Sequence, residues 1–322
     1  MKKIYGLKEK YNKAIVTGGA GFIGSHLIES LLDEGLEVIS IDDYSTGKEE
    51  NLRHLENNTK LKIVKCDVTD YSELKKYFEG VDIVFHEAAS KKTICLKDPR
   101  RDLQVNGAGT FNILELSRDF KVKKVVHAST GSVYGEPIIF PQNEEHPLRP
   151  NSYYGVSKLS GDRYARAFVD LYNLDVTILR YFHVYGPRQE YNDFGGVIPI
   201  FCRKLLQNES PIIHGDGSQQ RSFTYVDDIV NINKLVAITD GTKGEIYNCP
   251  SGISVTIEEI ALNIRKELNK ENLEIIHDDW TIGDIKYFEL DNKKVKALGY
   301  PSFVDFDKGL KETIDWMKKV IK

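Results

Sequence analysis

The stretch Lys13-Ala-Ile-Val-Thr-Gly-Gly-Ala-Gly-Phe-Ile-Gly24 decides the fold. It begins with an apolar run typical of a buried strand, passes through a cluster of glycines, and continues into residues 22–32, where apolar side chains recur at helical spacing. Glycines here permit a tight turn and let the backbone approach a pyrophosphate, which then lies at the helix N-terminus. The stretch therefore predicts a strand, a turn and a helix that bind a dinucleotide.

A second predicted strand, residues 37–41, ends at Asp42-Asp43. A dinucleotide fold places an acidic residue at this point to bind the hydroxyls of the adenosine ribose. Two carboxylates would repel the additional phosphate of NADP. No arginine stands beside them in the sequence, and the nearest cation is Lys48. The pair therefore predicts NAD rather than NADP.

Strand and helix patterns then alternate as in a doubly wound parallel α/β sheet, the Rossmann arrangement. Further strands are expected at 61–66, 81–86, 124–128 and 175–182, and helices at 71–78, 100–118 and 151–172. Residues 1–182 are interpreted as the NAD-binding Rossmann domain, with residues 1–12 peripheral. Residues 183–322, with helices near 226–239, 256–268 and 308–320, are interpreted as a smaller substrate-binding lobe interleaved with the sheet.

Ligands of such sheets bind beyond the carboxyl ends of the strands. The polar residues that follow the predicted strands are therefore expected to converge there; they are Asp42, Asp67, Ser90, Lys91 and Thr130.

Tyr154 and Lys158 are four positions apart, so in a helix they lie on one face. A free tyrosine has a pKa near 10, and a nearby cation favours the phenolate and lowers that pKa. The pair is interpreted as a catalytic acid/base with its supporting cation. The alternative is an ordinary pair on the surface of a helix.

Composition excludes several function classes. The formal charge of −4 provides no basic surface for nucleic acid, and the apolar runs are too short for a membrane helix. The four cysteines are widely spaced, which is typical of a reduced compartment and offers no cysteine-based metal site. We expect a cytoplasmic protein that binds no metal.

With these residues in view, the chain resembles the extended short-chain dehydrogenase/reductase family, specifically its NAD-dependent nucleotide-sugar epimerases and dehydratases. The resemblance covers roughly residues 13–300. Besides the glycine stretch and Asp42-Asp43, its marks are Cys66-Asp-Val68, His86-Glu-Ala-Ala89, Ser129-Thr130, Val133-Tyr-Gly135, Tyr154-x-x-x-Lys158, Tyr181-Phe-x-Val-Tyr-Gly-Pro-Arg188 and Gly215-Asp-Gly…Arg221…Val226-Asp-Asp228.

The resemblance implies a role for each matched position. The NAD contacts would be Gly18, Gly21, Phe22 and Ile23 at the pyrophosphate, Asp42 and Asp43 at the ribose, Asp67 and Val68 at the adenine, and Ala88, Ala89 and Lys91 along the cofactor. Tyr154 would be the acid/base, Lys158 would bond the nicotinamide ribose, and Thr130 would bond the reacting sugar hydroxyl. The helices at 100–118 and 151–172 would pair with their copies in a homodimer.

The resemblance also separates the possible reactions. The family's dehydratases carry an Asp-Glu pair directly after the Ser/Thr, and its uronic-acid decarboxylases keep the glutamate, but this chain has Gly131-Ser132. The expected reaction is therefore 4-epimerisation of a nucleotide sugar, such as UDP-glucose or UDP-galactose, through a transient 4-keto sugar. One alternative is a nucleotide-sugar oxidoreductase with net redox turnover. Another is a non-catalytic NAD-binding protein.

The substrate pocket departs from the family pattern. His183 replaces the asparagine that contacts the substrate phosphate, and Thr281 replaces a later arginine. Arg221 remains to bind the diphosphate, because its planar guanidinium suits phosphate oxygens. Phe288 is expected to gate the 2-substituent of the sugar in favour of a small group.

Three further residues are interpreted as structural. His86 and His127 fall in strand patterns and are expected to be core or strand-end residues. Cys95 is expected to be a buried thiol.

Overall fold

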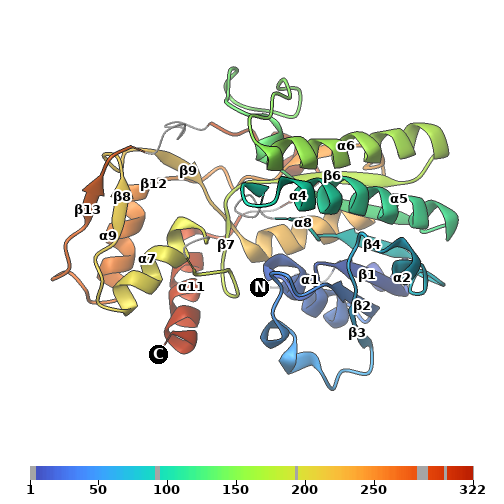
Figure 1. Cartoon of the computed structure of the whole chain (residues 1–322), viewed down its shortest axis with the longest axis horizontal. Coiled ribbons are helices and arrows are strands. Elements are labelled where there is room, and N and C mark those ends of the chain that lie inside the picture. The colour runs from blue at the N-terminus through green and yellow to red at the C-terminus, as the bar shows by residue number, and fades with distance from the viewer. Residues whose placement is uncertain (1–4, 91–94, 193–194, 281–288, 301–302, 322) are drawn as a thin grey trace.

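The fold is built on a seven-stranded parallel sheet (Figure 1). The computed structural model describes residues 5–90, 95–192, 195–280, 289–300 and 303–321. The sheet order is β11-β6-β5-β4-β1-β2-β3. Its strands are β1 (Lys13–Thr17), β2 (Glu37–Asp42), β3 (Leu61–Lys65), β4 (Ile83–His86), β5 (Lys124–Thr130), β6 (Val176–Tyr181) and β11 (Ile246–Asn248). The strand order reverses between β1 and β4, so the ligand crevice of such a sheet opens at their carboxyl ends.

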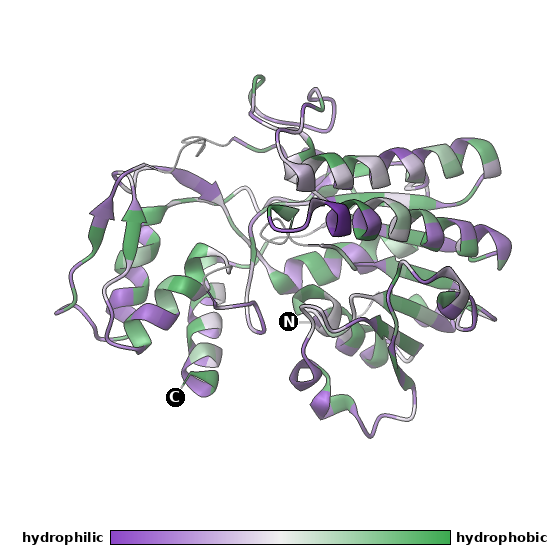
Figure 2. Cartoon of the chain, viewed as in Figure 1, coloured by the Kyte–Doolittle hydropathy of each residue, from purple (hydrophilic) through white to green (hydrophobic). Residues whose placement is uncertain are grey.

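Helices cover both faces of the sheet. α1 (Phe22–Asp33) and α8 (Val226–Ile238) pack on one face, and α2 (Tyr71–Lys75), α5 (Thr110–Asp119) and α6 (Tyr153–Tyr172) on the other. Side chains of a strand point alternately to the two faces. In β1, Ala14 and Val16 join the core beneath α1, whereas Ile15 joins the core beneath α6. Figure 2 shows hydrophobic segments within the sheet and in the helices beside it. The predicted α/β class is confirmed.

The helix predicted at 100–118 contains a π-helical segment at the glycines that interrupt its pattern. α4 (Pro99–Leu103) runs through Gln104–Gly109 into α5. Within this segment the buried Asn106 accepts a 2.9 Å hydrogen bond from the backbone N–H of Ser90 and donates one of 3.0 Å to the hydroxyl of Ser157. The π segment thereby joins the end of β4 to α6, and π-helical turns often occur at functional sites.

The second half of the chain forms a lobe beside the sheet and also contributes to the sheet. α7 (Val197–Leu206), α9 (Ile257–Glu267) and α11 (Phe306–Val320) enclose a separate core. Short ladders complete the lobe: β8 (Ile212–His214) with β13 (Ile276–Asp278), β9 (Gln220–Ser222) with β12 (Ser254–Thr256), and β7 (Val184–Tyr185) with β10 (Thr224–Tyr225). Between these elements the chain returns to the sheet as α8 and β11. The short α10 (Lys293–Ala297) follows β13.

The expectation that residues 1–12 are peripheral is wrong for the part that the structure describes. Leu7 and Tyr11 are buried, and the Tyr11 hydroxyl donates a 2.7 Å hydrogen bond to the carbonyl of Ala237 on α8. The carboxylate of Glu34 accepts hydrogen bonds from three successive backbone N–H groups, those of residues 5–7. These anchors lie far away in the sequence, so the polar composition of the segment did not reveal them.

Among the described residues, no helix is both long and apolar enough to cross a membrane, and no three His, Cys, Asp or Glu side chains are grouped to hold a metal ion.

Candidate active site

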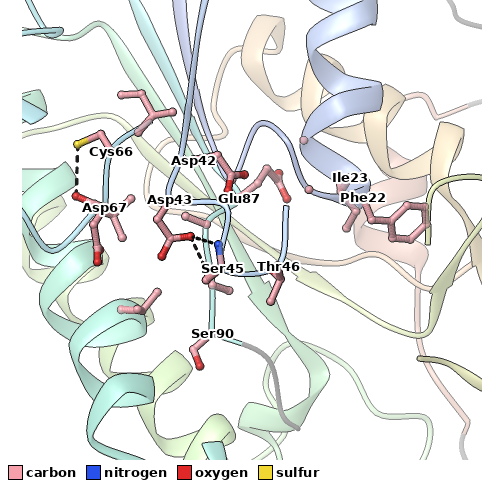
Figure 3. Close-up of a pocket in the computed structure, with 18 of the residues that line it drawn as sticks. Phe22, Ile23, Asp42, Asp43, Ser45, Thr46, Cys66, Asp67, Glu87 and Ser90 are labelled. Atoms are coloured by element: carbon pink, nitrogen blue, oxygen red, sulfur yellow. Dashed lines mark hydrogen bonds between the residues drawn. The ribbon is translucent and has the colours of Figure 1, made fainter. Parts of the chain in front are cut away.

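A cavity of about 290 Å³ opens at the carboxyl ends of β1, β2, β3 and β4 (Figure 3). Its wall at the glycine turn is formed by Gly18, Gly21, Phe22 and Ile23. The turn is closely packed, since a Cβ on Gly24 would lie 2.2 Å from the carbonyl oxygen of Gly18. The N-cap of α1 forms no side-chain hydrogen bond, so the turn can present backbone N–H groups to an anion. The turn therefore fits the pyrophosphate of a dinucleotide.

Asp42 lines this cavity and also fixes the turn. Its carboxylate accepts hydrogen bonds of 2.9 Å from the backbone N–H of Ala20 and 2.8 Å from that of Tyr44. Burial raises the pKa of Asp42, and these two hydrogen bonds act in the opposite direction. Asp43 is turned toward the cavity, with one oxygen held by the backbone N–H of Ser45 at 2.9 Å (Figure 3).

Arg101 lies between the carboxylates of Asp43 and Asp67, at the end of the cavity away from the glycine turn. Its Nη2 atom is 2.9 Å from Oδ2 of Asp43 and 2.7 Å from Oδ2 of Asp67. The pKa of Asp67 lies below its ordinary value: burial raises it, but hydrogen bonds from Thr69 and Arg101 outweigh that effect. The expectation that no arginine accompanies the acids is correct along the sequence and wrong in space. Arg101 belongs to the first turn of α4, the helix that follows β4. A helix that follows a parallel strand begins at the carboxyl edge of the sheet, and this position could have revealed Arg101 from the sequence.

Three residues after β4 form the cavity wall nearest to the sheet: Glu87, Ala88 and Ala89. The Tyr181 hydroxyl donates a 2.8 Å hydrogen bond to the Glu87 carboxylate and accepts one of 2.7 Å from Asn233. Burial raises the pKa of Glu87 to about 7, whereas the bond from Tyr181 and the charge of Lys158 act to lower it. No role of this carboxyl group was predicted from the sequence.

Tyr154, Lys158 and Thr130 lie together where α6 begins beside the end of β5. The Ser152 side chain caps the helix by accepting a hydrogen bond from the N–H of Gly155. Lys158 is 2% exposed, and its ammonium group donates a 2.5 Å hydrogen bond to the carbonyl of Ala128. Burial raises the pKa of Tyr154 to about 12, and a hydrogen bond with Thr130 acts in the opposite direction. The expected lowering of this pKa by Lys158 is not seen, because burial is the largest influence on it.

A buried ion pair joins α6 to the neighbouring strand β6. Asp162, one turn after Lys158, is bonded to the guanidinium of Arg180 at 3.2 Å, and both side chains are buried. His127 lies 3.6 Å from Asp162 and stacks on His86 with ring centroids 5.4 Å apart. Burial lowers the pKa of both imidazoles, so they are neutral core residues, as expected. Cys95 is buried as well.

A second cavity, of about 420 Å³, lies in the lobe and brings His183 and Arg221 together. Most of its wall is apolar, and α7 contributes Val197, Ile198 and Phe201 to it. Arg221 is 9% exposed and donates a 2.8 Å hydrogen bond to the carbonyl of Gln220. The predicted contacts Lys91 and Phe288, together with Thr281, lie outside the described residues.

Comparisons with known proteins agree with this arrangement. A model of the NAD dependent epimerase/dehydratase family matches residues 14–249. A UDP-glucose 4-epimerase of Mycolicibacterium smegmatis is 34% identical over 313 residues, which span 95% of this chain and 98% of that protein. A UDP-N-acetyl-alpha-D-glucosaminuronate decarboxylase of Bacillus cytotoxicus is 33% identical over 322 residues, or 96% and 98% of the two chains.

Solved structures show the same fold. The UDP-glucose 4-epimerase of Thermotoga maritima, determined with UDP-glucose, superposes with a TM-score of 0.90 at 35% identity, covering 96% of this chain and all of that one. The family match, the full-length relatives and the glycine-lined cavity lead to one conclusion. The chain is an enzyme of the NAD-dependent epimerase/dehydratase family, with NAD as its cofactor.

Proposed function

We propose that the protein is a nucleotide-sugar 4-epimerase that acts on a UDP-hexose such as UDP-glucose or UDP-galactose. The observation that carries the proposal is the sequence Thr130-Gly131-Ser132 at the end of β5. It supplies a hydroxyl for the reacting sugar but none of the acidic groups that the family's dehydratases and decarboxylases carry directly after it.

The packing around Gly131 supports this reading. A Cβ built on Gly131 would lie 2.3 Å from the ring of Phe182, closer than real Cβ atoms approach a neighbour. An aspartate could not occupy this position without displacement of that ring, which is 5% exposed and packs in the small core of Val133 and Tyr134. Elimination of water would therefore lack its acid for a steric reason.

The proposed chemistry uses the three residues at the start of α6 and the end of β5. NAD, when bound, accepts a hydride from the sugar and returns it. Tyr154 acts as the phenolate, removing the proton of the C4 hydroxyl and later returning a proton to the C4 oxygen, while Thr130 holds that oxygen. Burial disfavours the phenolate, and the positive charge of oxidised NAD would favour it. Lys158 keeps Tyr154 and Thr130 together through its bond to Ala128. The 4-keto sugar rotates in the site between the two hydride transfers, so that the hydride returns to the opposite face of C4.

The lobe cavity is proposed to bind the nucleotide. Its apolar wall suits a base, and Arg221 with His183 would meet the diphosphate. UDP is favoured because both 4-epimerase relatives described above are named for UDP-glucose. In this proposal, residues 1–182 bind the cofactor and residues 183–322 bind the nucleotide sugar.

We also propose a homodimer formed through α6. Four of its five exposed large apolar residues lie on one side of the helix, the exception being Tyr172, and Leu103 of α4 is exposed as well. The residues on α6 are Tyr153, Val156, Tyr164 and Leu171. Figure 1 shows α5 and α6 running side by side as the outer layer of this half of the molecule. A second copy of the same surface would cover the apolar residues.

A panel of nucleotide sugars tests the proposed reaction. The purified protein is incubated under anaerobic conditions with UDP-glucose, UDP-galactose, their N-acetyl and uronic-acid forms, and GDP- and dTDP-hexoses. Proton NMR follows the sugar, and absorbance follows reduced nicotinamide. A C4-inverted sugar without accumulating NADH supports the epimerase and identifies its substrate. Stoichiometric NADH would instead support the oxidoreductase alternative, which the unusual His183 favours.

A further inference from the structure

Arg101 is the structural feature of the cofactor cavity that an NAD-selective site does not require. One guanidinium nitrogen, Nη2, contacts both Asp43 and Asp67, at 2.9 Å and 2.7 Å. The other, Nη1, is 3.5 Å from the hydroxyl of Thr69. All three acidic residues at this end, Asp42 included, line the cavity together with Arg101. The arginine therefore belongs to the wall that would face the adenosine.

The side chains at this end of the cavity carry a net negative charge. Three carboxylates and one guanidinium line this end, and only two of the carboxylates, those of Asp43 and Asp67, contact the guanidinium. A further phosphate would be repelled, which agrees with NAD as the cofactor. An arginine near this position is nevertheless what dinucleotide folds use to accept the 2′-phosphate of NADP. Its planar fork suits phosphate oxygens well. Here Asp43 and Asp67 both occupy one prong of that fork, the Nη2 atom.

We propose that Arg101 is a latent 2′-phosphate ligand and that Asp43 determines the selection of NAD by masking it. Asp43 is the residue of the masking pair that follows β2, where the adenosine ribose is expected. Removing the Asp43 charge takes away one repulsive group and releases the guanidinium from one of its two partners. Affinity for NADP should then rise, and the rise should depend on Arg101.

Asp43→Asn is the sharpest variant for this test. Oδ1 of Asp43 accepts the hydrogen bonds from the backbone N–H and the hydroxyl of Ser45, whereas Oδ2 contacts Arg101. Asparagine keeps an oxygen for Ser45 and presents an N–H₂ group where Oδ2 was. The loop after β2 therefore retains its internal bonds, and the change falls on the contact with the guanidinium.

The experiment measures the dissociation constants of NAD and NADP by displacement of bound NADH, whose fluorescence reports occupancy. The quantity compared is the ratio of the NADP constant to the NAD constant in four proteins: wild type, Asp43→Asn, Arg101→Gln and the double variant. Arg118→Gln is the matched control, because Arg118 pairs with Asp119 and Glu115 and does not line the cavity. Thermal melting of each protein checks the fold.

The expected result is a fall in this ratio of tenfold or more in Asp43→Asn. In the double variant the ratio should lie within threefold of that in Arg101→Gln, and Arg118→Gln should match the wild type. The tenfold gain should shrink at high salt, because Arg101 is 28% exposed in its side chain. A smaller fall in Asp43→Asn, or an equal fall in the double variant, would overturn the proposal. A purely structural role of Arg101 would change both dissociation constants together and leave the ratio unmoved.

Discussion

The ammonium group of Lys158 donates a 2.5 Å hydrogen bond to the carbonyl oxygen of Ala128, two residues before Thr130 at the end of β5. Both partners are buried, and burial lowers the pKa of Lys158 while Asp162, Glu87 and Asp102 raise it. The bond ties the helix that carries Tyr154 to the strand that carries Thr130. The lysine therefore organises the site in addition to supplying a charge.

Replacing Tyr154 by phenylalanine should abolish turnover while NAD binding persists. The variant removes the proposed acid/base and leaves the ring, and general acid–base catalysis typically contributes about 10²–10⁴-fold. Tyr153→Phe is the matched control, because Tyr153 is the adjacent residue and is 59% exposed. We expect kcat to fall by at least that factor in Tyr154→Phe and to stay near wild type in Tyr153→Phe. Comparable activity in the two variants would contradict the assignment.

Gly131→Ala should destabilise the protein because its Cβ would meet the ring of Phe182. Overpacking of this kind typically costs about 1–3 kcal/mol in the free energy of unfolding. The cost should shrink when Phe182→Leu is added, since neighbouring residues that share space are not additive. Urea denaturation of both single variants and the double variant measures the coupling. Additive effects would show that the ring does not exclude a side chain at position 131.

Glu87→Gln should change the pH dependence of stability. The pKa of Glu87 is raised to about 7, chiefly by burial, so between about pH 4.5 and pH 7 the folded protein holds a proton that the unfolded chain releases. The wild type should therefore lose stability relative to Glu87→Gln as the pH rises through this window. The loss is at most about 3 kcal/mol, at 1.36 kcal/mol for each unit of pKa difference. Urea denaturation at pH 5 and pH 8 measures it.

The exposed Glu145→Gln provides the control for this measurement, because it makes the same substitution at a side chain on the surface. A difference between wild type and Glu87→Gln that does not vary with pH would show that the carboxyl group titrates as it would in water.

Val156→Glu should convert the proposed dimer to a monomer. Val156 is 55% exposed on the apolar side of α6, so a carboxylate there would be buried in the proposed interface. Leu262→Glu on α9, at a position 40% exposed, is the control and should leave the molar mass unchanged. Size-exclusion chromatography with light scattering reads the result. A wild-type protein that is already monomeric would contradict the dimer.

The fold was predictable because its signals are local. The apolar run before Gly18 and the helical spacing after Gly21 specify a strand, a turn and a helix wherever they occur. β11 was missed, since three residues carry no pattern and their strand character comes from pairing with β6.

The same distinction applies to the site. Tyr154 and Lys158 are four residues apart, so their spacing revealed them, whereas Arg101 is 58 positions from Asp43 and only folding brings them into contact. The pKa of Tyr154 could not be derived from its sequence neighbours either, because its largest determinant is burial.

The most direct test of 4-epimerisation follows the hydrogen on C4. UDP-glucose carrying deuterium at C4 is incubated with the protein in ordinary water, and NMR and mass spectrometry locate the label in the product. Transient oxidation at C4, with return of the same hydride, predicts UDP-galactose that retains deuterium at C4 while no NADH accumulates. An inverted product that has lost the label to solvent, or a label found only in released NADH, would contradict the proposed reaction.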